Sequence, residues 1–195
     1  MNAPQDSAYT FHLLTPERWT DFERLFGAHG AYAGCWCMFW FLRGSDFTRG
    51  QCDPNRLAMK ARVEAGLTPG MLAYLGDEPV GWCAFGPREQ YPRLLASRTL
   101  KPVDDAPVWS IVCFYVAKEH RKRGVSKALL RAVIEEVRRR GGTFVEGYPS
   151  PSTGEGRPDP FVYLGLEAAF REVGFVEVAR PTPRRLIMRY SIQHP

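Results

Sequence analysis

The amino-acid sequence predicts a mixed α/β (α+β) fold, in which a mostly antiparallel central sheet carries helices on both faces. Apolar runs with strand character alternate with segments of helical periodicity along the 195 residues. Residues 108–116 are apolar on both alternating faces, which is the pattern of a central strand covered on both sides. A helical segment joins this run to the next strand, 143–149, so the two strands should be parallel neighbours.

The first half of the chain predicts a strand, two helices and a hairpin. Residues 9–14 form the strand, and Thr15 followed by Pro16 is a cap-and-proline signal that opens a helix. The apolar face of this helix consists of Trp19, Phe22, Leu25 and Phe26. Asp53 and Pro54 repeat the signal and open a second helix to about residue 65. Residues 71–75 and 80–85 flank a four-residue connection and predict a hairpin, and 87–107 should hold a short helix and a loop.

The second half predicts a βαβ unit, a helix and a closing hairpin. In the strand 108–116, one face should hold Val108, Val112, Phe114 and Val116, and the other Trp109, Ile111, Cys113 and Tyr115. The following helix begins near Val125 and ends in residues 138–140 before Gly141. Residues 162–173 predict a helix, and 176–180 with 185–190 a hairpin across 181–184. No repeat or second domain is visible, so residues 1–195 should form one domain.

Composition limits the classes of function. Five cysteines are an odd number without framework spacing, and the first twenty residues lack the pattern of a secretion signal, so we expect a reduced, cytoplasmic protein. No apolar stretch approaches the roughly 20 residues of a membrane helix, so we expect no membrane span. The net charge of +5 suits an anionic ligand, a solvated surface or nucleic acid alike.

A basic cluster surrounds one glycine where the strand 108–116 gives way to the helix. His120, Arg121, Lys122 and Arg123 precede Gly124. Like charges at a helix N-terminus oppose the helix dipole, whereas the free backbone N–H groups there would stabilise a bound polyanion. Neither the glycine spacing of a Walker loop nor the three glycines of a dinucleotide fingerprint occur. The sequence therefore predicts an anion-binding turn of another kind.

The order of residues in this turn resembles the signature of the GNAT superfamily of N-acetyltransferases. Val116, Arg121, Gly124 and Ser126 stand at the signature positions, with Ser126 in place of the usual glycine or alanine. The order of strands and helices also matches over about 11–190, and 168–175 ends in the Gly-Phe pair common in the family.

The resemblance implies a GNAT-like sheet whose parallel fourth and fifth strands splay around the cosubstrate acetyl-CoA. Its pyrophosphate would bind the backbone amides of the turn, and its pantetheine arm would lie between the splayed strands. The implied cofactor-binding residues are Phe114, Tyr115, Val116, Arg121, Lys122, Arg123, Gly124, Val125 and Ser126.

Acetyl transfer needs a polarised thioester carbonyl, a neutral amine and a proton for the departing thiolate. The resemblance implies that a backbone N–H near Phe114 or Tyr115 polarises the thioester carbonyl. Some family members carry a glutamate in the first half of the fourth strand. This chain has Ser110 at that position, so the direct assignment of a base fails. Glu146 and Tyr148 on the fifth strand are then the candidate bases, directly or through water, with a water held by Ser110 as a further candidate. For Glu146, an ordinary ion pair with an arginine is the alternative.

The proton donor for the thiolate is also open. Family members commonly place a tyrosine four residues before the glycine of the Gly-Phe pair, and here that position is Phe170. Tyr148, Tyr163 and solvent are the alternatives.

The aromatic connection 31–44 raises two questions. Cys35 and Cys37, with His29 before and Cys52 after, could supply four zinc ligands, but their spacing does not fit a structural zinc site, so we expect buried thiols and no metal. In GNAT folds this region overhangs the acceptor side. The resemblance thus implies that Trp36, Phe39 and Trp40 are substrate-binding residues.

The leading prediction is an enzyme that moves an acetyl group from acetyl-CoA to a primary amine of a small molecule or peptide. One alternative is a GNAT-fold regulator that binds CoA without turnover. Another is a nucleic-acid-binding module that uses the basic clusters 121–123 and 138–140. These clusters lie about 20 Å apart on one helix and cannot form one patch, so we expect no nucleic-acid partner. A homodimer is left open.

Overall fold

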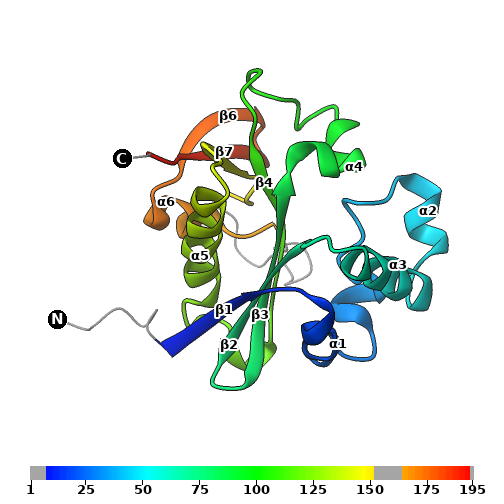
Figure 1. The fold of residues 1–195 in the computed structure, drawn as a ribbon. Coiled ribbons are helices and arrows are strands. Elements are labelled where there is room, and N and C mark those ends of the chain that lie inside the picture. Colours follow the sequence, from blue (N-terminus) through cyan, green and yellow to red (C-terminus); the bar gives the residue numbers. More distant parts are fainter. Residues whose placement is uncertain (1–7, 152–163, 194–195) are drawn as a thin grey trace.

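The protein is built on one mixed sheet of seven strands in the order β1-β2-β3-β4-β5-β7-β6 (Figure 1). The computed structural model describes residues 8–151 and 164–193. The strands are β1 Tyr9–Leu13, β2 Gly70–Leu75, β3 Glu78–Pro87, β4 Trp109–Val116, β5 Phe144–Gly147, β6 Val176–Thr182 and β7 Arg185–Ser191. Only the β4–β5 pair among these strands is parallel. The predicted fold class is confirmed.

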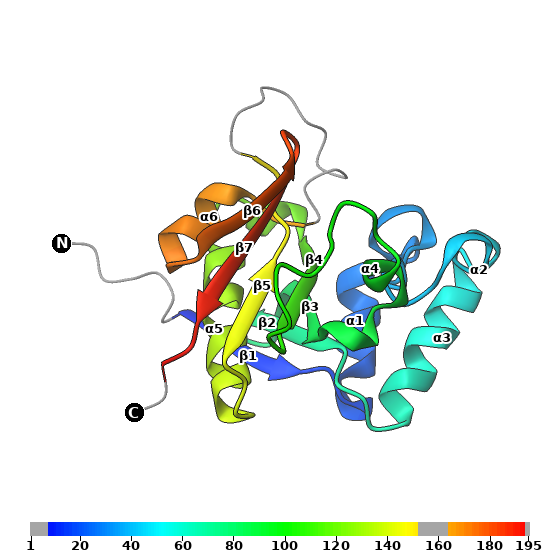
Figure 2. The same ribbon diagram turned by 90° about the horizontal axis from the view of Figure 1, so that it is seen from above.

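Helices cover both faces of this sheet. They are α1 Trp19–Phe26, α2 Gly44–Arg49, α3 Asp53–Glu64, α4 Pro92–Leu95, α5 Val125–Arg139 and α6 Glu167–Val173. The view from above shows α5 and α6 on one side of the sheet and α1 to α4 on the other (Figure 2). In the described part of the chain, no helix has both the length and the apolar character that crossing a membrane requires.

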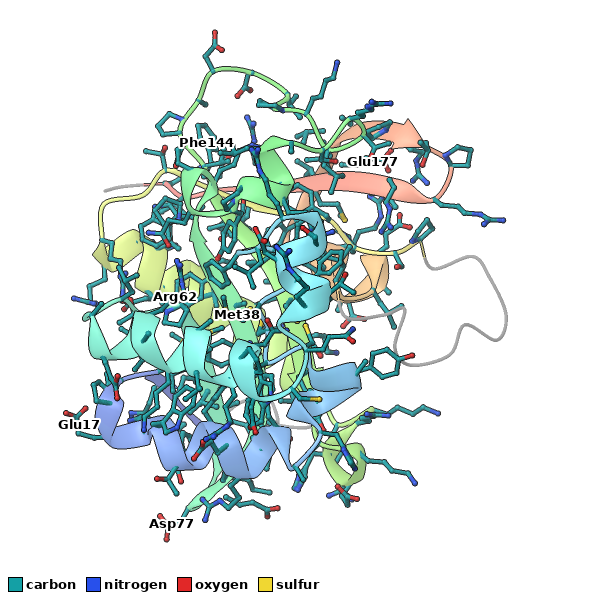
Figure 3. The ribbon with its side chains drawn as sticks, turned by 90° about the vertical axis from the view of Figure 1, so that its right-hand side faces the viewer. Glu17, Met38, Arg62, Asp77, Phe144 and Glu177 are labelled. Carbon is teal, nitrogen blue, oxygen red and sulfur yellow. The ribbon has the colours of Figure 1, made fainter. Side chains whose placement is uncertain are left out.

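Each face of the sheet has its own buried core. The core beneath α1 and α3 is rich in aromatic side chains, and all four apolar residues predicted for the first helix are buried in it. Figure 3 looks onto this face, where Met38 lies buried at the centre while Glu17 and Asp77 project outward at the edge. The core beneath α5 and α6 is mainly aliphatic.

Several boundaries differ from the sequence-based prediction. A single 3-10 turn, Pro16–Arg18, precedes α1. The hairpin between β2 and β3 is closed by two residues rather than four, because Gly76 adopts a φ of 59° that permits a tight turn. Helix α6 begins at Glu167 rather than 162, since Ser150 pairs with Leu166 in an isolated bridge. The short helix α2 was not predicted.

The prediction of strict alternation along β4 is wrong. Ala84 of β3 pairs with Cys113 and Phe85 pairs with Ile111, so one extra residue of β4, Val112, forms a β-bulge. Val112 and Cys113 consequently both pack into the core beneath α1. Beyond the bulge the alternation is shifted by one residue.

Candidate active site

The β4–β5 pair opens partway along its length. Its paired residues run only from Trp109 to Ile111 on β4, whereas β4 continues to Val116. Past Ile111, β4 therefore has no pairing with β5 in the described structure. The backbone of Phe114 and Tyr115 lies along this open edge, where its polar groups can meet a ligand.

The turn that follows β4 holds a left-handed glycine at the start of α5. Gly124 has φ 84° and ψ −2°, a conformation that side chains other than glycine adopt only with strain. A Cβ added to Gly124 would have no heavy atom within 4 Å, so the space beside it is open. The first helical bond runs from the Ala128 N–H to the Gly124 carbonyl, which leaves the earlier amides of α5 for other acceptors.

Neighbouring contacts fix the shape of this turn. The Arg121 Nε donates to the Val116 carbonyl at 3.1 Å, and Lys122 has a positive φ of 61°. Tyr9 donates its hydroxyl hydrogen to the Arg123 carbonyl at 3.2 Å. Lys122 and Arg123 are exposed. The turn thus presents backbone amides and two solvated cations at one helix N-terminus.

Other residues predicted for cofactor binding pack into the core. Phe114 meets Phe170 edge-on, with ring centroids 6.1 Å apart, and Tyr115 packs on Phe26 at 5.3 Å. Val125 is buried, and Ser126 is partly buried. These four residues can reach a ligand through their backbone, while their side chains hold the helix and strand in place.

The three predicted catalytic residues come together in one buried network. Ser110 lies opposite Glu146 in the β4–β5 register. The Tyr148 hydroxyl is 2.9 Å from the Ser110 Oγ and donates to the Glu146 Oε2 at 3.4 Å. It also accepts a hydrogen bond from the Arg88 guanidinium at 2.9 Å. Burial raises the pKa of Tyr148 well above its ordinary value, with the Glu146 charge as the next cause, so the phenol stays protonated at neutral pH.

Glu146 is enclosed by cations. Its Oε1 accepts from the Arg189 Nε and Nη2 at 3.0 and 2.7 Å, and its Oε2 lies 3.9 Å from Arg88. Only 1% of Glu146 is exposed. Arg189 in turn donates to both carboxylate oxygens of Asp104, at 2.7 and 3.0 Å. This geometry favours the ion-pair alternative for Glu146, because a proton acceptor must be able to reach the substrate.

Sequence reasoning missed the arginines and Asp104 in this network. One signal was present: Glu146 and Arg189 are direct cross-strand partners on β5 and β7. That signal is readable only once β7 is known to lie beside β5. Arg88 and Asp104 reach the network from connections outside the sheet and give no periodic signal.

The predicted acceptor residues divide between a core and a cavity. Trp36 is buried and stacks on Phe26 with ring centroids 5.9 Å apart. Phe39 and Trp40 instead line a cavity of about 440 Å³, to which Leu100 also contributes. The Leu100 carbonyl accepts a hydrogen bond from Arg88, so this cavity adjoins the catalytic candidates. Tyr163 lies outside the described residues.

The cysteines are free thiols, and all but the exposed Cys52 are buried or partly buried. All five are free, and the Trp82 Nε1 donates to the Cys37 Sγ at 3.2 Å. Burial, with a smaller contribution from the neighbouring Cys37, raises the pKa of Cys35 to about 11, which disfavours the thiolate that zinc requires. Among the described residues, no three His, Cys, Asp or Glu side chains are grouped so that they could hold a metal ion.

The basic cluster 138–140 at the far end of α5 forms ion pairs within its own helix. Arg138 pairs with Glu135, and Arg139 and Arg140 both pair with Glu136, at 2.8 and 2.6 Å. The two glutamates therefore balance two of the three charges of this cluster.

The chain is similar to known proteins in both its sequence and its fold. Residues 20–148 match the model of the Acetyltransferase (GNAT) family. No curated protein matches the chain. A GNAT-family acetyltransferase structure from Listeria monocytogenes is 10% identical, with a TM-score of 0.57 over 94% of this chain and 95% of that one.

Two further solved structures contain ligands. PaiA N-acetyltransferase from Thermoplasma acidophilum, in complex with coenzyme A, is 11% identical, with a TM-score of 0.53 over 94% of this chain and 99% of that one. YncA from Salmonella typhimurium, with its cofactor acetyl-CoA, is 15% identical, with a TM-score of 0.51 over 96% of each chain. At these identities the structures establish the shared fold, and the match over residues 20–148 establishes that the chain belongs to the GNAT family of acetyltransferases.

Proposed function

We propose that this protein transfers an acetyl group from acetyl-CoA to a primary amine by direct attack in a ternary complex. The observation that carries the proposal is the turn at Gly124, where a left-handed glycine beside open space begins α5 at the mouth of the β4–β5 opening. The complexes of PaiA with coenzyme A and of YncA with acetyl-CoA support the assignment of the ligand.

In this proposal the two halves of acetyl-CoA meet different parts of the chain. Its diphosphate accepts hydrogen bonds from the backbone amides of residues 121–126, and Lys122 and Arg123 add positive charge. Its pantetheine arm lies along the open edge of β4 and brings the thioester toward Phe114 and Tyr115. A helix N-terminus supplies both N–H groups and a partial positive charge, which explains why no further anion-binding motif is needed.

The chemistry follows from that placement. A backbone N–H of the open β4 edge donates to the thioester oxygen, which stabilises the negative charge that develops there. The neutral amine nitrogen attacks the carbonyl carbon, the carbon–sulfur bond breaks, and the amine loses a proton while the CoA thiolate gains one. We propose that Glu146 and Arg88 hold the Tyr148 hydroxyl in position beside Ser110, and that water carries the protons. In a five-cysteine chain with free thiols, a reducing compartment such as the cytoplasm suits this role.

A CoA-binding regulator without turnover is the second candidate. The observation that favours it is the burial of all three predicted catalytic residues, each at most 1% exposed. Such a protein would bind CoA and acetyl-CoA with similar affinity and acetylate no amine.

Thermal unfolding with added ligands tests the proposal. A ligand that binds only the folded state at 100 times its Kd stabilises it by about 2.7 kcal/mol. For a chain of this length that corresponds to a rise in Tm of about 5–10 °C. We expect this rise with acetyl-CoA and CoA, and none with a short oligonucleotide. Release of CoA in the presence of an amine panel then separates the enzyme from the regulator. No rise with millimolar acetyl-CoA would contradict both.

A further inference from the structure

The cavity beside the aromatic connection 31–44 is lined by arginines. Arg43, Arg93 and Arg185 contribute to its wall, and no carboxylate residue of 8–151 or 164–193 does. The hydroxyl-bearing Ser97 and Thr99 add further hydrogen-bond donors. Three arginines in the wall of a cavity of about 440 Å³ give it a positive charge.

Among the twenty arginines of the described residues, ten pair with a described carboxylate and these three do not. Arg189 has two carboxylate partners, and arginines on α1, α2, α3 and α5 also form ion pairs. Arg43, Arg93 and Arg185, in contrast, make no ion pair with any residue of 8–151 or 164–193. Gathering unpaired cations raises their mutual repulsion, and an anionic ligand would relieve it.

Arg93 is held ready for such a ligand. Its Nε donates to the Leu42 carbonyl at 3.1 Å, and its backbone N–H donates to the Trp40 carbonyl at 3.4 Å. Its guanidinium lies 4.0 Å from the centroid of the Phe39 ring. These contacts fix the planar group from one side, while its terminal nitrogens form no hydrogen bond to the described residues. A guanidinium fixed in this way loses little conformational entropy when it binds an oxyanion.

The cavity also lies beside the proposed transfer site. Leu100 lines it, and its carbonyl accepts from Arg88, which donates to Tyr148. On the other wall, Arg185 begins β7, the strand that pairs with β5 up to Gly147. A molecule bound in the cavity is therefore close to the end of β5, where the β4–β5 opening begins.

We infer that the amine acceptor carries an oxyanion, a carboxylate or a phosphate, which binds to Arg43, Arg93 and Arg185 while its amine faces the thioester. The inference rests on the proposed acetyl transfer and names its acceptor class. A cavity of about 440 Å³ suits a free amino acid or an amine of similar size. Guanidinium groups bind both kinds of oxyanion through paired, charge-assisted hydrogen bonds.

Matched acceptors test the inference. We would compare glycine, β-alanine and 4-aminobutyrate with alkylamines of equal length, and phosphoethanolamine with ethanolamine, by the release of CoA. We expect a higher kcat/KM for the acid-bearing member of at least one pair. The amino-acid pairs test for recognition of a carboxylate, and the phosphoethanolamine pair tests for recognition of a phosphate.

Substitution at the two less constrained arginines makes the test specific. Hydrogen bonds to charged groups contribute about 1.5–3 kcal/mol, so Arg43→Gln with Arg185→Gln should lower kcat/KM for the acid-bearing acceptor about tenfold or more. The same double variant should leave the oxyanion-free partner and acetyl-CoA binding unchanged. Arg98→Gln is the matched control, since Arg98 is exposed nearby but does not line the cavity.

A binding measurement separates failure of this inference from failure of the proposed function. With the Gly124 turn occupied by saturating CoA, inorganic phosphate and glutarate should further raise the Tm of the wild type and of Arg98→Gln, and not that of the double variant. If acetyl-CoA binds and oxyanion-free amines are acetylated as fast as their acid-bearing partners, the inference is overturned and acetyl transfer stands. If acetyl-CoA does not bind, the proposed function fails whatever the cavity binds.

Discussion

Substitution of Gly124 tests whether the turn before α5 binds the diphosphate of acetyl-CoA. A side chain in the left-handed region costs about 1–2 kcal/mol, so Gly124→Ala should lower the free energy of unfolding by this amount. Gly141, at the other end of α5, has a similar φ of 76° and equally open surroundings, which makes Gly141→Ala a matched control for strain. Both variants should therefore lose about 2–8 °C in Tm, at 2–4 °C per kcal/mol.

A glutamate separates strain from ligand binding. In Gly124→Glu, a carboxylate about 4 Å from a phosphate would repel it by about 1–4 kcal/mol, depending on the local dielectric. The Kd for acetyl-CoA should then rise about fivefold to several hundredfold. Gly141→Glu places the same charge at the far end of the helix and should leave the Kd unchanged.

Isothermal titration at two salt concentrations is the suitable assay. Repulsion between partly exposed charges is screened by salt, so the loss of affinity in Gly124→Glu should shrink at high ionic strength. A folded Gly124→Glu variant with the affinity of the wild type would show that this glycine merely begins a helix. An equal loss in both glutamate variants would place the diphosphate elsewhere.

Three further predictions concern the buried network and the thiols. Glu146→Gln should lower stability by about 3–5 kcal/mol, because the buried Arg88 is left without its carboxylate while Arg189 keeps only Asp104; a fall in kcat at unchanged Tm would instead identify Glu146 as the base. The hydrogen bonds from Arg189 lower the pKa of Asp104, so the stability from this pair is present above about pH 3.9 and is lost as the pH falls through the folded-state pKa. Acid unfolding of Asp104→Asn should lack this component, and an identical acid transition in wild type and variant would refute it. Reduced protein purified without chelator should hold no stoichiometric zinc by elemental analysis, and one zinc per chain that Cys37→Ser abolishes would contradict this.

The sequence predicts the architecture well because each element carries its own local signal. The apolar run 108–116, the switch to helical period at Val125 and the glycine before it all lie within one short segment. The bulge at Val112 could not be predicted, since Val112 and Cys113 are both apolar and fit either face of a strand buried on both sides.

The site was predicted only in part, for a related reason. The cofactor turn is contiguous in sequence, so its residue order alone indicates an anion site. The arginine-lined cavity is assembled from the connection 39–44, the segment 93–100 and the start of β7, which only the packing of the chain brings together. Arg43, Arg93 and Arg185 each read as an ordinary surface arginine until their common cavity is known.

The arrangement of β4 favours direct transfer over an acyl-enzyme intermediate. Cys113 is the thiol on β4 beside the opening, and a covalent route would need its thiolate as nucleophile. A hydrogen bond with Cys37, together with burial, raises the pKa of Cys113 well above its ordinary value, so the thiol stays protonated at neutral pH. The Gly124 turn and the arginine-lined cavity, in contrast, belong to segments on opposite faces of the sheet: α5 covers one face, and the connections around α2 and α4 cover the other (Figure 2). In the proposed reaction, the two substrates would approach the β4–β5 opening from opposite faces and meet there, so that no covalent relay is needed.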